Sequence, residues 1–160
     1  MRIFQDNKKV SIKRITYSGL AWITLAYVDI RLKLFPCGKK FTLLKSRSDI
    51  PIRRKLSYKS NIEQILNKWE DAVMRASRYP LGLTMNCIRR AIALRIILRM
   101  YGIKTELCYG ISHVSVKEHP GHAWLVVLHE GPCKGRLLGA NSNLEQYTLL
   151  QGDKVDNGKQ

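Results

Sequence analysis

The hydrophobic period of the chain changes at Gly102, and this change limits the fold more than any other feature. Before Gly102, the segments 58–80 and 86–101 repeat apolar residues every three or four positions, which is typical of helices. After it, the short apolar runs "TELCYGI", "HAWLVVLHE" and "GRLLGAN" are separated by glycine, proline and polar residues, which predicts antiparallel strands. We therefore expect an α+β domain with helices first and a small sheet last.

Upstream of these helices, the segment 17–36 predicts a helix that Pro36 ends. Its uncharged stretch, residues 15–28, is shorter than the roughly 18 residues that span a bilayer. We expect three parts: a basic and apolar helical segment over 1–57, a core over 58–150, and a flexible tail over 151–160.

The chain is strongly basic, with 28 Lys+Arg against 12 Asp+Glu and a net charge of +16. Such a charge attracts nucleic acid, anionic membranes or acidic peptides. The basic residues are dispersed and aromatic residues make up only 8%, so we expect no nucleic-acid partner. Peripheral membrane contact through residues 8–34 stays open.

The four cysteines form no C-x-x-C pair, and the polar, basic first 14 residues do not form a secretory signal. Free thiols in the cytoplasm follow as the simplest expectation, with membrane association open. The Cys and His spacing does not match a zinc site, so we expect no metal and no cofactor.

Cys87 is the first candidate for chemistry. Asn86 is a favourable N-cap, which makes Cys87 the first residue of a helix. The helix dipole and free N–H groups there favour a thiolate and an oxyanion. The apolar face of this helix points the thiol toward the strands, and the exposed faces carry Arg89, Arg90, Arg95 and Arg99. The alternative is a buried core thiol, because free cysteine is often buried.

A thiol nucleophile needs a base, and His122 begins a strand directly after a Pro-Gly turn. Alternation places Trp124 on the same strand face, where it would shield the pair from water if that face packs on the Cys87 helix. We expect the other histidines, His113, His119 and His129, at the surface. Counting back across the next hairpin brings residues 141–143 opposite His122. Asn141 is therefore favoured as the group that orients the imidazole, with Asn143 as the alternative.

The order of helix-borne Cys, strand-borne His and polar residue resembles the papain and transglutaminase superfamily. More narrowly, "CIRRAIALRIILRMYGIKTELCYGI" followed by "GHAWLVVL" resembles the transglutaminase-like leader peptidases of lasso-peptide biosynthesis. The resemblance covers about residues 60–150. This chain departs from the family at two places. "LVV" follows Trp124 at the point where the family has an acidic residue, and Asn141 stands where the family commonly has an aspartate.

The resemblance implies a cysteine peptidase that removes the leader from a ribosomally made precursor peptide. Cys87 would be the nucleophile, His122 the general base and acid, and Trp124 and Asn86 would border the site. The implied partners are the precursor, a small leader-recognition protein and an ATP-dependent cyclase. Two alternatives stay open: an acyltransferase or amidase with the same Cys–His pair, and a non-enzymatic basic adaptor that binds membrane or nucleic acid.

Overall fold

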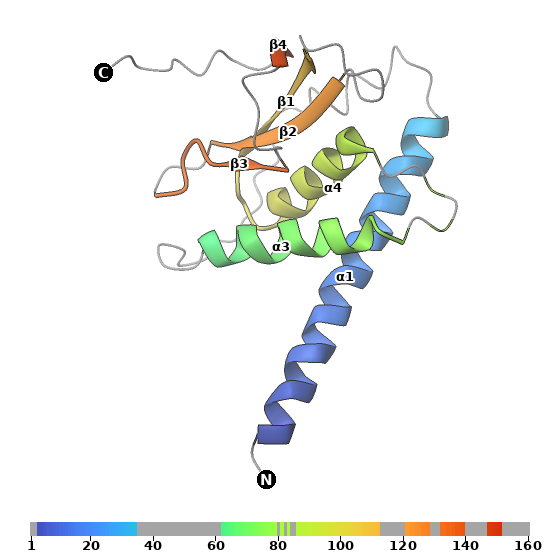
Figure 1. Ribbon diagram of the computed structural model, residues 1–160, viewed down its shortest axis with the longest axis vertical. Helices are drawn as coiled ribbons and strands as arrows, with labels where there is room; N and C mark the ends of the chain where they lie inside the picture. The colour runs from blue at the N-terminus through green and yellow to red at the C-terminus, as the bar shows by residue number, and fades with distance from the viewer. Residues whose placement is uncertain are drawn as a thin grey trace.

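The computed structural model describes residues 3–34, 62–79, 81, 83, 86–112, 121–128, 132–139 and 147–151, with side chains of the first helix described from Thr16. Within these residues, three helices precede a four-stranded sheet (Figure 1). The α+β fold expected from the change of period is confirmed.

Helix α1 (Ile3–Leu34) is longer than the predicted helix over 17–36. The basic segment before residue 17 contains no glycine or proline that would interrupt a helix, so the same helix continues through it. Its C-terminal half packs on α3 and α4, while its N-terminal half extends away from the other elements (Figure 1). Ala21, Leu25 and Val28 face the core.

Helix α3 (Ile62–Ala76) follows the predicted apolar stripe. Leu66, Trp69 and Val73 are buried, and the Trp69 ring meets Tyr17 of α1 edge-on at a centroid distance of 4.9 Å. Trp69 is therefore a core residue. These contacts fix α3 against α1 by burial of a large aromatic surface.

Helix α4 (Cys87–Met100) lies between the other two helices and the sheet. Because neighbours cover it on several sides, even its arginines are at most partly exposed. The prediction that Arg89, Arg90, Arg95 and Arg99 mark exposed faces was therefore wrong. The sequence favours one apolar face for this helix, but α1 and α3 cover the flanks of that face.

The sheet has the order β3-β2-β1-β4, and its paired strands are antiparallel. The strands are β1 (Thr105–Ser112), β2 (Gly121–Val127), β3 (Leu137–Leu138) and β4 (Tyr147–Gln151). The first three match the predicted runs.

A strand at β4 was not predicted. It pairs with β1 beside Gly110, where an added Cβ would lie 2.6 Å from the Thr148 carbonyl oxygen. Glycine at 110 is what allows β4 to approach so closely.

The face of β2 that packs on the helices carries Ala123, Leu125 and Val127, which belong to the main core. Trp124 and Val126 lie on the opposite face with Cys108. The condition under which Trp124 would shield the pair, that its face packs on the Cys87 helix, is therefore not met. Alternation defines two faces of a strand but does not say which one a helix covers.

Candidate active site

Cys87 begins α4, as the sequence predicted. Asn86 adopts an extended backbone with φ −82° and ψ 170°, and its side-chain oxygen accepts a hydrogen bond from the Arg89 N–H at 3.1 Å. The cap therefore ends the chain's extended course and starts the helix at the thiol. The Cys87 Sγ lies 3.9 Å from the Gly121 carbonyl oxygen, so the helix end meets the start of β2.

The structure brings Cys87 and His122 together. A hydrogen bond to His122 lowers the pKa of the Cys87 thiol against the opposing effect of burial, and the Ala123 and Ile88 N–H groups lower it further. The same hydrogen bond raises the pKa of His122. Both shifts favour a thiolate beside an imidazolium, which is the charged form of a reactive cysteine pair.

His122 is oriented by a main-chain carbonyl. Its Nε2 lies 3.0 Å from the Gly139 oxygen. A carbonyl oxygen only accepts hydrogen bonds, so Nε2 carries the proton, and Nδ1 is the nitrogen left for the thiol. The imidazole is only 8% exposed, and the Trp124 and Tyr147 rings lie beside it at centroid distances of 6.1 and 5.6 Å. The two neighbouring aromatic rings keep most water away from the imidazole.

The other predicted site residues either neighbour the pair in a different role or lie outside the described residues. The side-chain oxygen of Asn86 serves the helix cap, and Trp124 neighbours His122 from the sheet face opposite α4. Asn141 and Asn143, the predicted orienting residues, lie outside the described residues. Gly139, two positions before Asn141, makes the contact that was expected of an amide side chain.

A cavity of about 150 Å³ opens beside the thiol. Glu70 and Arg90 lie at its wall with Cys87 and Gly139. Its apolar lining comes from α3, α4 and the sheet and consists of Val73, Met74, Ala91, Leu94, Ala123 and Leu138. An apolar pocket with a few polar groups next to a nucleophile is the usual form of a binding site for part of a substrate.

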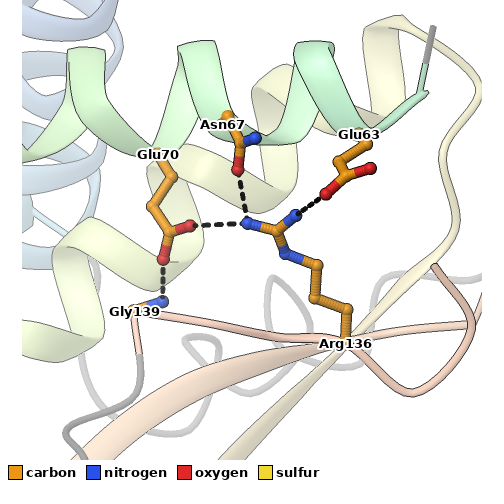
Figure 2. A network of polar contacts seen from close by, with 5 residues as sticks. All are labelled: Glu63, Asn67, Glu70, Arg136 and Gly139. Atoms are coloured by element: carbon orange, nitrogen blue, oxygen red, sulfur yellow. Dashed lines mark hydrogen bonds and ion pairs between the residues drawn. The ribbon is translucent and has the colours of Figure 1, made fainter.

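Three residues around the pair were not among the predicted site residues: Gly139, Glu70 and Arg136. Glu70 accepts the Gly139 N–H at 2.7 Å, and Arg136 reaches Glu63, Asn67 and Glu70 (Figure 2). One signal was present, because residues 63, 67 and 70 form a polar stripe along α3 at helical spacing. Nothing in the sequence linked that stripe to a loop almost 70 residues away.

A buried ion pair supports the first turn of α4. Asp29 of α1 is fully buried, and its carboxylate lies 2.7 Å from Arg89 Nε and 2.7 Å from Lys33 Nζ. Burial raises the pKa of Asp29, but the contacts with Lys33 and Arg89 outweigh it and hold the pKa below the usual value. Because the Arg89 N–H also donates to the Asn86 cap, this pair fixes the helix end that carries Cys87.

Two further cysteines in the described part of the chain lie apart from the pair. Cys108 is buried in β1 and Cys133 lies half-buried in the turn before β3, both as free thiols. Cys37, His113, His119 and His129 lie outside the described residues. Within the described part of the chain, no group of three His, Cys, Asp or Glu residues could hold a metal ion, and no helix is long and apolar enough to cross a membrane.

The family of the chain follows from a match to a family model. The model of the transglutaminase-like superfamily matches residues 32–151, from the end of α1 to the end of β4. The chain belongs to the transglutaminase-like superfamily. The match includes both Cys87 and His122, and the superfamily includes cysteine peptidases. No curated protein and no solved structure matches this transglutaminase-like chain significantly.

Proposed function

We propose that this protein is a cysteine peptidase that cuts the leader from a ribosomally made lasso-peptide precursor. The observation that carries the proposal is the Cys87–His122 pair at the N-terminus of α4, with its lowered thiol pKa and raised imidazole pKa. The motifs around both residues resemble the lasso-peptide leader peptidases, which supports the narrower substrate class.

In the proposed reaction, the Cys87 thiolate attacks the carbonyl carbon at the leader–core junction. The negative charge that develops on the carbonyl oxygen lies near N–H groups of the first turn of α4, which stabilise it. His122 donates its proton to the core amine as the C–N bond breaks, leaving the leader as a thioester on Cys87. Water then attacks the thioester while His122 takes up a proton, and the leader leaves with a free carboxylate.

The cavity beside Cys87 is large enough for one side chain of a peptide but not for a leader. Most of the capture energy therefore has to come from elsewhere. We propose a separate small leader-recognition protein as the partner that supplies it, with the ATP-dependent cyclase acting on the freed core amine.

The test is incubation of the precursor and the leader-recognition protein with wild type, with Cys87→Ala and with Cys133→Ala, followed by mass spectrometry. We expect cleavage at one bond by wild type and Cys133→Ala, and none by Cys87→Ala. Cys133 is the matched control because its thiol is also free and half-buried.

Cleavage by Cys87→Ala at the wild-type rate would contradict the proposal. A leader joined to an added amine such as glycine methyl ester, without hydrolysis, would instead indicate the acyltransferase alternative. An intact precursor in every reaction, with no selective alkylation of Cys87, would favour the basic adaptor.

A further inference from the structure

Gly139, the residue directly after β3, connects helix α3 to His122. Gly139 uses both of its main-chain groups: its N–H donates to Glu70 Oε1 at 2.7 Å, and its carbonyl oxygen lies 3.0 Å from His122 Nε2. One residue therefore stands between a carboxylate on α3 and the candidate base on β2.

The connection is mechanical. The N–H and C=O of one residue belong to different peptide planes, so Glu70 does not polarise the carbonyl directly. It holds the peptide plane before Gly139 in place, and so limits where the Gly139 Cα and its C=O can lie.

Strand β3 ends directly before Gly139, and its Leu138 is fully buried in the main core. Strand β3 contains only Leu137 and Leu138, and its register with β2 is limited to the pairs with Val126 and Leu125. Gly139 has φ +70°, in the left-handed region that other residues rarely adopt. A strand this short does not by itself fix the direction of the next carbonyl, and Glu70 contacts the Gly139 N–H from outside the sheet.

Glu70 is itself held in place. The Arg136 guanidinium lies 3.6 Å from its second oxygen and 2.5 Å from Asn67 Oδ1, and it also lies 3.8 Å from Glu63 (Figure 2). Arg136 precedes β3, so the arginine and Gly139 clamp both ends of the strand to one stripe of α3. A charge-assisted hydrogen bond of 2.7 Å inside such a cluster is stronger than a neutral one.

We propose that Glu70 is a positioning residue: it holds Gly139 so that the Gly139 carbonyl, rather than a side-chain amide, orients His122 toward Cys87. The inference deepens the proposed function and rests on it for its relevance to catalysis. Its claim about the Cys87–His122 pair concerns the free protein and is tested without a substrate.

The experiment measures the rate at which iodoacetamide alkylates Cys87 across a range of pH, by mass spectrometry of the full chain. Glu70→Ala removes the acceptor, and Glu70→Asp keeps the charge but shortens the reach. Glu70→Gln keeps an oxygen at the same place. Glu63→Ala is the matched control, because Glu63 contacts Arg136 from the same stripe but does not contact Gly139.

We expect Glu70→Ala and Glu70→Asp to slow alkylation near neutral pH by about 10-fold and to move the profile to higher pH, because a misplaced imidazole no longer stabilises the thiolate. Glu70→Gln and Glu63→Ala should keep the wild-type profile. Arg90, the charged group of α4 that acts on His122, is unchanged in all four variants.

A purely structural role would lower the melting temperature and leave the pH profile in place, and this result in both Ala and Asp variants would overturn the inference. So would a shift caused by Asn141→Ala with none caused by Glu70→Ala, because the amide would then be the orienting group. If wild type cleaves no precursor but its alkylation profile depends on Glu70, the proposed function fails and this inference stands.

Discussion

At the scale of single residues, the chemistry of the site depends on two groups that change each other's protonation. The hydrogen bond between Cys87 and His122 lowers the thiol pKa and raises the imidazole pKa. The two groups titrate as a coupled pair, and each shift increases the population of the thiolate–imidazolium form. The directions of the two shifts predict two different pH profiles.

The rate of Cys87 alkylation and the rate of precursor cleavage should therefore depend differently on pH at high pH. Alkylation of Cys87 needs only the thiolate, so its rate should rise at a pH below that of a free thiol such as N-acetylcysteine and then stay level. Cleavage also needs the imidazolium as proton donor, so its rate should fall again as His122 loses its proton. His122→Ala should move the alkylation profile up toward that of the free thiol; a wild-type profile that already matches the free thiol would contradict the ion pair.

These residues also show how far the sequence can predict a site. Cys87 and His122 were predictable because their positions depend on local signals, a helix cap and the start of a strand. Gly139 was not, because its contact depends on a positive φ after a two-residue strand and on Glu70 across the fold. The side-chain orienting group predicted at Asn141 stays a prediction.

At the scale of the elements, the position of the thiol depends on how α4 is held between its neighbours. Asp29 of α1 pairs with Arg89 in the first turn of α4, and Leu94 and Leu98 anchor the rest of the helix in the core. The sequence predicted the three helices, but not that two of them would meet at a buried charge. The period of a helix shows its apolar face and not the partner of a charge beside it.

Asp29→Asn should destabilise the fold, because it leaves the mostly buried Arg89 without its countercharge. We expect a loss of about 3 kcal/mol in the free energy of unfolding at about pH 7, from urea denaturation. The folded-state pKa of Asp29 is lowered, so its contribution is present above the ordinary aspartate pKa and is lost as the pH falls through the folded value. The cost of the variant should therefore shrink in acid.

The matched control is Asp71→Asn on the surface of α3. Asp71 is 73% exposed and lies 3.9 Å from Arg75, so we expect a loss below about 0.5 kcal/mol. Equal losses in the two variants would mean that the buried pair does not hold α1 on α4.

At the scale of the whole molecule, the outer face of α1 stands out. Five large apolar residues are at least half exposed there, and they repeat every three or four positions: Leu20, Ile23, Tyr27, Ile30 and Leu34. We call them the outer stripe. The inner face of this half of α1, which packs on the core, is also apolar. A helix that is apolar on both faces usually has protein or lipid against both of them. A narrow stripe at this spacing suits a partner helix.

The net charge restricts what covers the outer stripe. Two copies of a chain with a charge of +16 repel each other, which disfavours pairing of the stripe with itself. A partner with acidic residues beside its apolar face would be attracted instead. In the proposed function, that partner is the leader-recognition protein.

The double variant Ile23→Glu/Ile30→Glu should therefore weaken binding of the leader-recognition protein by about 10-fold or more, measured by isothermal titration calorimetry. Precursor cleavage should fall with it, while Cys87 alkylation should keep the wild-type rate, because the stripe lies on the face of α1 away from α4. Leu128→Glu, at an exposed apolar position after β2, is the control and should bind as wild type does.

Unchanged affinity in the double variant would place the partner elsewhere. Loss of a wild-type dimer in sedimentation would show instead that the stripe pairs two copies of the chain, and that charge repulsion is too weak to prevent it.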